Sequence, residues 1–341
     1  MIGYALWLML LSMVGRRMKA SAVACANQGL IKYWGKTDEV ERLPTNDSIS
    51  VCLDALTTRT TVEFSARYPQ DSFVLNGHKL DDQRIFRHLD LIRSLARSTL
   101  RARVESQNDF PPAVGLASSA SGFAALTVAA CGAIGLSLPQ DYLTRIARKG
   151  SASASRSIPG GFAQLVAGGD DVHTIASSLA GPDDIDFKTL VVVVGKAPKP
   201  VSSTEGMRIT AHTSPFFRTR LSNTAAVLET MRNAIAQRDS LTIMRLAEAD
   251  TLSMHACMLT SNPPLVYWTG GTLEVVRTVL SLRKEGRTAY FSIDAGQNVF
   301  VNTSSEEASL VKTRLEETPG VVSVLSSSPG GPARFVDDNL F

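Results

Sequence analysis

The chain has 341 residues, 44% of them hydrophobic and 20% charged, which is typical of a globular protein with apolar material for one large core or two fused ones. The net charge of +3 is small and the basic residues are dispersed. This argues against a nucleic-acid partner but suits an anionic small-molecule substrate. The four cysteines include no Cys-x-x-Cys pair, so we expect reduced thiols and a cytoplasmic protein rather than disulfides or zinc.

The chain opens with an apolar run at 2–14 that is followed by Arg16 and Arg17. The run is too short to span a bilayer comfortably. A signal peptide carries its positive charge before the apolar stretch, whereas here the arginines follow it. We therefore expect no membrane association and no secretion, and we interpret residues 1–17 as a possible N-terminal extension before a second start at Met18.

In the first half of the chain, alternation and apolar runs predict strands, and helical spacing predicts helices. The predicted strands are 21–26, 48–53, 58–64 and 101–105, and the predicted helices are 81–99, an Ala-rich helix ending near Gly135, and 140–149.

The second half begins with a continuous β-branched run at 190–195, which predicts a buried strand. The elements predicted after it are helices at 217–237, 240–255 and 272–284, a strand pair at 289–294 and 298–302, a helix at 305–317 and a strand at 321–326. Strands and helices mix without strict βαβ alternation, which indicates an α+β protein with a domain boundary beside the strand at 190–195.

The stretch PPAVGLASSASGFAAL at 111–126 places small residues and serines at the start of a helix. Glycines and serines before a helix let the backbone approach phosphate groups, and the helix N-terminus favours negative charge. The stretch lacks the Gly-Lys-Ser/Thr of a P-loop. Taken alone, it is equally consistent with a tightly packed helix of small residues.

This stretch resembles the phosphate-binding motif of the GHMP small-molecule kinase superfamily. Other stretches resemble one branch of it, the diphosphomevalonate decarboxylase family: ANQGLIKYWGK (26–36), LPTNDSISVCLD (43–54), RIARKGSASASRSIPGGF (145–162), VSSTEGM (201–207) and FSIDAGQN (291–298). The resemblance implies a two-lobed α+β fold, with an N-terminal ATP-binding domain at 18–188, a C-terminal domain at 189–341 and the active site between them.

The same resemblance implies an ATP-dependent decarboxylation. The 3-hydroxyl of a phosphorylated mevalonate receives the γ-phosphoryl group of magnesium-bound ATP, and phosphate then leaves together with carbon dioxide. Catalysis of this kind relies mainly on positioning and charge stabilisation. Members of the family are often homodimers, which makes a homodimer possible here.

By resemblance, Asp294 lies beside the reacting hydroxyl, Lys36 and Tyr33 lie near that hydroxyl and the substrate phosphate, and Arg156 clamps the carboxylate. Further substrate-binding residues are Asn27, Ser151, Ser153, Ser203 and Thr204. The ATP-binding residues are Gly115, Leu116, Ser118, Ser119, Ser121 and Gly122, with Ser119 a weak candidate magnesium ligand. We expect a cation at Lys36 to favour ionised Asp294.

Each of these residues also has a structural interpretation. An aspartate at a strand end often forms a turn or cap, an arginine often forms a surface ion pair, and serines often cap helices. The five histidines show no metal-ligand spacing, so we assign none of them to a metal. The glycine-rich SSSPGGPA at 326–333 resembles a segment that closes beside the nucleotide, with a simple C-terminal turn as the alternative.

One departure from the family concerns the substrate. Typical members carry an arginine in an Asp-Arg-x-x-Leu-Asn-Gly pattern, where this chain reads DSFVLNG with Ser72. The arginine is expected to face the terminal phosphate of a diphosphate, so its loss favours mevalonate 5-phosphate and the product isopentenyl phosphate over the diphosphate. His78, Lys79 or Lys199 are possible replacements for the missing charge.

Two other functions remain open from the sequence. A GHMP kinase that does not decarboxylate would use the same phosphate loop. A non-catalytic ATP-binding sensor would have no need of Asp294, Lys36 and Arg156 together.

Overall fold

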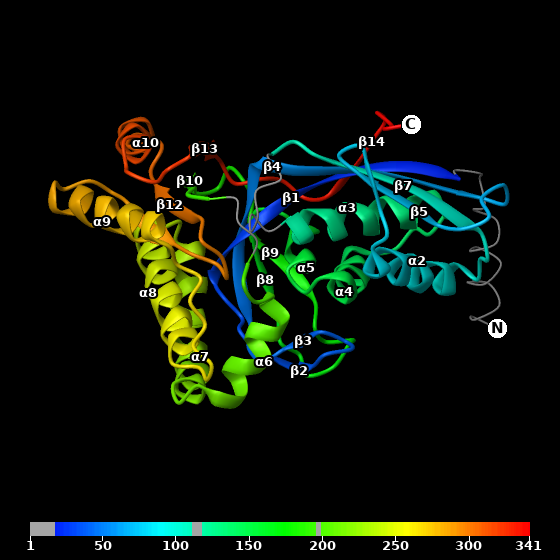
Figure 1. Cartoon of the computed structure of the whole chain (residues 1–341). Helices are drawn as coiled ribbons and strands as arrows, with labels where there is room; N and C mark the ends of the chain where they lie inside the picture. Colours follow the sequence, from blue (N-terminus) through cyan, green and yellow to red (C-terminus); the bar gives the residue numbers. More distant parts are fainter. Residues whose placement is uncertain (1–17, 111–117, 196–198) are drawn as a thin grey trace.

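The structure is a computed structural model that describes residues 18–110, 118–195 and 199–341 (Figure 1). The predicted extension at 1–17 and the predicted ATP-binding residues Gly115 and Leu116 lie outside the described residues. The chain forms two lobes, each built on its own sheet, as expected for a GHMP-kinase-like α+β fold.

The first lobe is built on an eight-stranded sheet of order β14-β1-β4-β7-β5-β6, with β8 and β9 attached beside β4. Its strands are β1 (Lys19–Ile31), β4 (Ser48–Ser65), β5 (Ser72–Leu75), β6 (His78–Leu80), β7 (Arg101–Asn108), β8 (Phe162–Leu165), β9 (Ala176–Ala180) and β14 (Arg334–Val336). The strands predicted at 48–53 and 58–64 are two halves of β4. One half pairs with β8 and the other with β7, which changes the polarity pattern midway along the strand.

Four helices, α2 (Gln83–Ala96), α3 (Ser118–Ala133), α4 (Gln140–Gly150) and α5 (Ala154–Ser157), gather on one face of this sheet (Figure 1). The alanines of α3 share a buried core with Ala20, Ala22 and Ala24 of β1. Small residues on both elements let the helix approach the sheet closely. The close packing considered for this stretch is therefore present, and it coexists with a helix N-terminus at the cleft. α2 is shorter than predicted because Asp82 caps its start and Arg97 ends it in the left-handed conformation.

The second lobe has a four-stranded sheet of order β11-β12-β10-β13. Its elements are β10 (Lys188–Val193), α6 (Ser203–Thr213), α7 (Phe217–Ala236), α8 (Ser240–Leu259), α9 (Gly270–Lys284), β11 (Tyr290–Ser292), β12 (Val299–Thr303), α10 (Ala308–Glu316) and β13 (Ser323–Ser327). Leu190 and Val192 face a core shared with α9 and α10. Val191 and Val193 face a second core, which includes α7, α8 and residues of β1 and β4. The two lobes are thus joined by continuous apolar packing, and the division at 188/189 stays a prediction.

Several elements were not predicted: the strands β5, β6, β8, β9 and β14, a two-stranded hairpin at 36–38 and 43–44, and the helices α5 and α6. α6 begins where we placed only the VSSTEGM motif, and β14 forms by pairing with β1, with Val23 opposite Arg334. The glycine-rich segment before β14 is hydrogen-bonded to the first lobe, since Gly330 N donates to Cys52 O at 2.8 Å and Gly161 N donates to Gly330 O at 2.8 Å. No helix in the described ranges is long and apolar enough to cross a membrane.

Candidate active site

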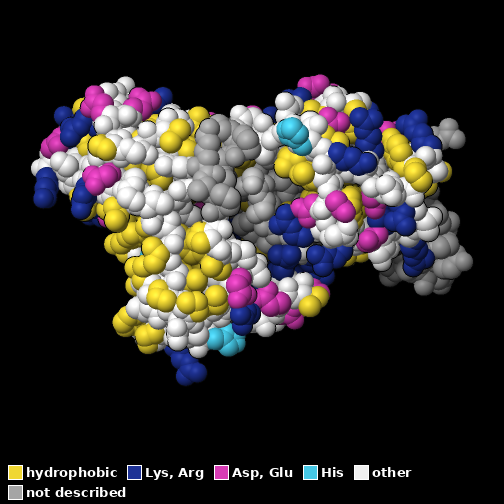
Figure 2. Space-filling view, in the orientation of Figure 1, with side chains coloured by type: hydrophobic (Ala, Val, Ile, Leu, Met, Phe, Trp, Pro, Cys, Tyr) yellow, Lys and Arg dark blue, Asp and Glu magenta, His cyan; other side chains and the backbone are white. Residues whose placement is uncertain are grey.

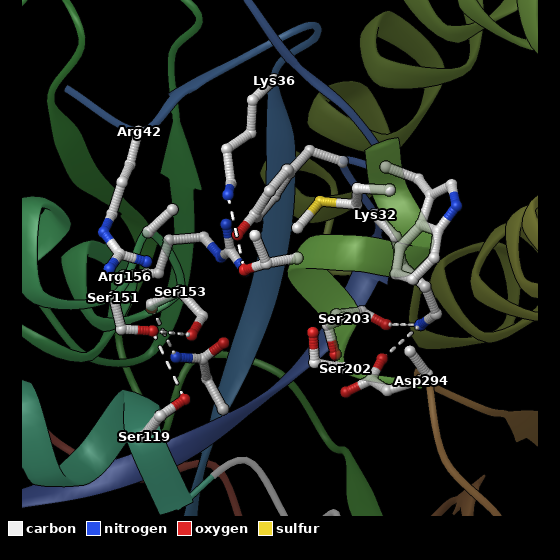
Figure 3. A pocket seen from close by; sticks show the side chains of 18 of the residues that line it. Lys32, Lys36, Arg42, Ser119, Ser151, Ser153, Arg156, Ser202, Ser203 and Asp294 are labelled. Atoms are coloured by element: carbon white, nitrogen blue, oxygen red, sulfur yellow. Dashed lines mark hydrogen bonds and ion pairs between the residues drawn. The ribbon is translucent and has the colours of Figure 1, made fainter. Parts of the chain in front are cut away.

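A cleft between the lobes brings together residues from seven segments of the chain, at 27–42, 84, 119–123, 150–156, 199–207, 254 and 294–295 (Figure 3). It is lined by ten of the predicted site residues: Asn27, Tyr33, Lys36, Ser119, Ser151, Ser153, Arg156, Ser203, Thr204 and Asp294. Their individual roles stay predictions, but their convergence on one cavity places an acid, several cations and a set of hydroxyls within reach of a common ligand.

Asp294 follows β11 and pairs with Lys32 rather than with Lys36. Lys32 Nζ lies 3.1 Å from Asp294 Oδ1 and donates to Ser292 Oγ at 2.7 Å and to the carbonyl of Gly29. The expectation that Lys36 supplies the cation beside Asp294 is therefore wrong. Lys32 stands directly after β1, where its buried side chain turns toward β11, whereas Lys36 lies on the next hairpin.

Gly29 packs directly against this pair. A Cβ atom at Gly29 would lie 3.0 Å from Lys32 Cγ, which is closer than most Cβ contacts, and 3.4 Å from Asp294 Oδ1, so a side chain there would press mainly on Lys32. The glycine of the ANQGL string therefore marks the site of the ion pair, a signal that the sequence contained and that we did not use.

Helix α8 anchors both sides of the pair. Asp250 accepts from the backbone N–H of Lys32 at 2.9 Å, and Arg220 of α7 donates to both the Lys32 carbonyl at 2.8 Å and Asp250 Oδ1 at 2.9 Å. On the other side, Thr251 Oγ1 accepts from the backbone N–H of Ile293 at 3.2 Å. The backbone positions next to both charged groups are thus fixed by neighbouring residues of one helix.

His255, one turn further along α8, lies behind the same strand end. Its Nε2 atom is 3.2 Å from the carbonyl oxygen of Ile293, the residue before Asp294. Burial lowers the pKa of His255 to about 4, so the ring is neutral at physiological pH. It therefore packs against the acid's backbone without adding a charge.

Arg156 is buried in the floor of the cleft, where its guanidinium donates to Ser50 Oγ at 2.8 Å and to Ser48 Oγ at 2.6 Å. Among the described residues no carboxylate lies within ion-pair distance of it. Burial lowers the pKa of Arg156, while Tyr33 and Asp294 raise it. A buried guanidinium that has only neutral partners is well suited to bind an anionic ligand group.

Three serines form a row of hydroxyls from α3 to the segment before α5. Ser119 Oγ lies 3.4 Å from Ser151 Oγ, which lies 3.0 Å from Ser153 Oγ. Asn27 supports this row, because its amide donates to the Ser153 carbonyl at 3.0 Å and to Ser157 Oγ at 2.8 Å. The row joins the predicted ATP-binding helix to the predicted substrate-binding residues.

The predicted ATP-binding residues that the structure describes lie in the first turns of α3. Ser118 and Ser119 are exposed, and Ser119 lines the cleft. Ser121 is fully buried, with its hydroxyl 2.7 Å from Thr58 Oγ1, so that side chain already has a partner within the fold. Gly122 is half-buried and has open space where a Cβ would lie. Their contacts with ATP stay predictions.

The N-terminus of α6 forms the opposite wall. Ser202 caps the helix, while Ser203 and Thr204 point into the cleft with lysines beside them. Lys199 Nζ donates to Ser203 Oγ at 3.2 Å, and Lys36 Nζ lies 3.5 Å from Thr204 Oγ1. A helix N-terminus flanked by two ammonium groups favours an anionic ligand.

Two arginines that we did not predict also line the cleft: Arg42, directly before β3 (Leu43–Pro44), and Arg84, in the first turn of α2. Together with Lys36 of β2 (Lys36–Asp38) they form a cluster that we call the basic corner. In the space-filling view, basic side chains gather beside the hollow between the lobes (Figure 2).

Ser72 does not line the cleft. Ser72 begins β5 and pairs with Arg103 of β7, which in turn pairs with Glu63 of β4. Glu63 lies near one end of β4, and the cleft partners of Arg156, Ser48 and Ser50, lie at the other end. The separation along the strand is about 40 Å. The substrate argument drawn from Ser72 therefore loses its geometric basis. Of the replacements considered, His78 and Lys79 lie on exposed β6, and Lys199 is the one that reaches the cleft.

Within the described residues, no group of three or more His, Cys, Asp or Glu side chains could hold a metal ion. The exposed hydroxyl of Ser119 at the start of α3 fits a magnesium ion that is held mainly by nucleotide phosphates, since Mg²⁺ commonly uses few protein ligands at such sites.

Fold and site together define the class: an ATP-dependent carboxy-lyase on the GHMP-kinase-like two-lobed scaffold. Residues 24–176 match the model of the diphosphomevalonate decarboxylase-like N-terminal domain, and residues 189–326 match that of the mevalonate 5-diphosphate decarboxylase C-terminal domain. The chain belongs to the diphosphomevalonate decarboxylase family.

Individual relatives agree with this assignment. The chain is 35% identical to the phosphomevalonate decarboxylase of Haloferax volcanii, over 94% of this chain and 99% of the relative. It is 35% identical to the diphosphomevalonate decarboxylase of Saccharomyces cerevisiae, over 94% and 85%. A solved structure of an enzyme called MDDEF, in complex with MVAPP, AMPPCP and magnesium, superposes with a TM-score of 0.88 at 38% identity, covering 94% of this chain and 99% of that one.

Proposed function

We propose that this protein decarboxylates mevalonate 5-phosphate in an ATP-dependent reaction that gives isopentenyl phosphate. The observation that supports this function best is the Lys32–Asp294 pair in the same cleft as the buried Arg156, which has no carboxylate partner among the described residues. A carboxylate that can accept a hydroxyl proton and a guanidinium that can hold a carboxylate are the groups that phosphorylation followed by decarboxylation requires.

The reaction balances in two steps. In the first, the 3-hydroxyl oxygen attacks the γ-phosphorus of ATP, ADP leaves, and Asp294 takes the hydroxyl proton while Lys32 offsets its charge. In the second, the bond between C3 and the phosphate oxygen breaks, and the departing phosphate takes the proton back from Asp294. The electron pair of the bond between C2 and the carboxyl carbon forms the C2–C3 double bond, and carbon dioxide is released.

Arg156 and the serine row also have a place in this scheme. Arg156 holds the substrate carboxylate, and the serine row from Ser119 to Ser153 lines the path between nucleotide and substrate. Magnesium, when bound, offsets the negative charge of the ATP phosphates. The relative bound to AMPPCP and magnesium supports both ATP and Mg²⁺ as cofactors here.

The preference for the 5-phosphate is supported by the charge of the basic corner. Lys36 is paired with Glu39 at 2.6 Å and Arg84 with Asp82 at 2.6 Å, so the corner carries one net positive charge among the described residues. A monophosphate needs less compensation than a diphosphate. The similarity to the phosphomevalonate decarboxylase of Haloferax volcanii along its whole length is consistent with this preference.

Side-by-side turnover of mevalonate, its 5-phosphate and its 5-diphosphate tests the proposal, with ADP, phosphate and carbon dioxide all measured. We expect the highest kcat/KM with the 5-phosphate and equal amounts of all three products. A higher kcat/KM with the diphosphate would overturn the monophosphate preference. ADP without carbon dioxide would identify a kinase instead. Ser72→Arg should leave the preference unchanged, because that position is remote from the cleft.

We also propose a cytoplasmic homodimer. The four cysteines are all free and buried, as in a reducing compartment.

The dimer is supported by an apolar surface over α7, α8 and α9 (Figure 2). Exposed leucines recur seven residues apart on two of these helices, at Leu252 and Leu259 of α8 and at Leu273 and Leu280 of α9. Light scattering should give twice the chain mass, and Leu252→Asp should give a monomer; a wild-type monomer would refute the dimer.

A further inference from the structure

Arg42 differs from its neighbours in the basic corner because it has no acidic partner. Lys36 and Arg84 are both ion-paired, with Glu39 and Asp82, whereas no hydrogen bond or ion pair involves the Arg42 guanidinium within the described residues. The side chain is half-buried and points from its hairpin into the cleft (Figure 3). Burial lowers the pKa of Arg42, and the nearby Arg84 and Arg87 lower it further, whereas Tyr33 and Glu39 raise it.

The backbone of Arg42 is also unusual. Its φ of 53° lies in the left-handed region, which is unfavourable for a residue with a long side chain. Arg97 and Arg238 share this conformation at helix ends, and Asn76 shares it in a tight turn, where it is common. Arg42 instead precedes a strand, so its conformation needs another source of support.

That support comes from α4. The fully buried Arg148 donates from Nε to the carbonyl of Glu41 at 3.1 Å, and Lys149 Nζ lies 2.8 Å from Glu41 Oε2. Within the hairpin itself, Asp38 Oδ1 accepts from the backbone N–H groups of Val40 at 2.8 Å and Glu41 at 2.7 Å. The turn is thus held from two directions, as expected where an unfavourable conformation aims a functional side chain.

We propose that Arg42 binds the 5-phosphoryl group of the substrate and helps to set the specificity for it. The inference rests on the proposed function. Lys36 begins the first strand of the hairpin and pairs with Pro44, and Arg42 ends its turn, two residues before Pro44. Both side chains line the cleft, so an anion bound by Lys36 would also lie beside Arg42. The nucleotide is expected at the start of α3, which belongs to another wall of the cleft.

Arg42→Gln tests the proposal, and Arg277→Gln serves as the control. Arg277 is an exposed arginine of α9 that donates to Glu274 and does not line the cleft. We expect Arg42→Gln to raise the KM for mevalonate 5-phosphate, and its calorimetric Kd, about ten- to a hundredfold. The KM for ATP and kcat should change less than about twofold, because Arg42 would contact the 5-phosphoryl group equally in the bound substrate and in the transition state.

A second variant, Arg42→Gly, separates the lost contact from a folding defect. Glycine accepts the left-handed conformation without strain, so this variant should melt no lower than the wild type while losing the same affinity for the 5-phosphate. Unchanged binding in both variants, or an equal rise in the KM for ATP, would overturn the role of Arg42. A wild-type enzyme that binds mevalonate 5-phosphate without releasing carbon dioxide would refute the proposed function and leave this binding test valid.

Discussion

Lys32 and Asp294 come from opposite lobes, and the Lys32 ammonium lies 3.1 Å from the Asp294 carboxylate at the point where the lobes meet. The ammonium also donates to Ser292, and the backbone groups of Lys32 are held by Asp250 and Arg220. The pair is therefore preorganised by the packing of the two lobes.

Lys32→Met should lower kcat at least about a hundredfold, because the charge facing Asp294 is lost where the reaction needs it. Lys36→Met should instead raise the KM for the phosphorylated substrate and affect kcat less. Steady-state kinetics of both variants measures the difference. If Lys36→Met proved the more damaging to kcat, the assignment of Lys32 beside the acid would be refuted.

Asp294→Asn should abolish turnover while ATP still binds with a Kd within about threefold of the wild type, since the amide keeps the shape but cannot accept the proton. Isothermal calorimetry with ATP and an assay of carbon dioxide measure the two properties. Residual turnover near the wild-type rate would show that another group acts as the base.

Arg156→Gln should impair decarboxylation more than phosphoryl transfer. Without the guanidinium the carboxylate is held less well, so ADP should form faster than carbon dioxide. Parallel rates of ADP and carbon dioxide release measure this ratio. An unchanged ratio with a lower total rate would indicate that Arg156 serves phosphoryl transfer as well.

Thr251→Val should lower kcat about tenfold with little change in KM, because it removes the hydroxyl that accepts from the Ile293 N–H and shifts the backbone beside Asp294. Thr224→Val is the matched control: Thr224 is a buried threonine whose hydroxyl bonds to the carbonyl of Arg220 within α7. Both variants should lose about 1 kcal/mol of unfolding free energy. Equal kcat values would argue against positioning by α8.

Stability should fall in acid because of two buried histidines, His255 and, with the larger shift, His88. His88 is buried between α2 and α3, 2.9 Å from Thr127 Oγ1, and burial, with a smaller effect of Arg42, lowers the pKa of His88 from 6.5 to about 3. Between these pH values the unfolded chain binds a proton that the folded protein excludes, so the free energy of unfolding falls as the pH is lowered through this range.

Urea unfolding at pH 7.5, 6 and 5 measures that slope. His88→Gln should make that slope less steep, because one of the two buried histidines no longer contributes to it. An identical slope in the His88 variant would assign the acid sensitivity to other groups.

Local sequence was sufficient for much of the secondary structure. The helices α3, α4, α7 and α9 and the strand pair β11–β12 lie close to their predicted positions, because their periodicity reflects which faces are buried. Short elements whose existence depends on a distant partner were missed, such as β14, which pairs with β1. The bounds of β1 and β4 were underestimated for the same reason.

The sequence by itself determined the family and ten of the residues that line the cleft, because motifs such as IKYWGK and SIDAG carry chemistry in short strings. Tertiary structure alone decided which lysine of IKYWGK meets Asp294, that Arg42 and Arg84 reach the cleft, and that Ser72 does not. Those outcomes depend on the packing of α8 against β1 and β11 and on the register of β5, which are long-range contacts that a local string of residues does not encode.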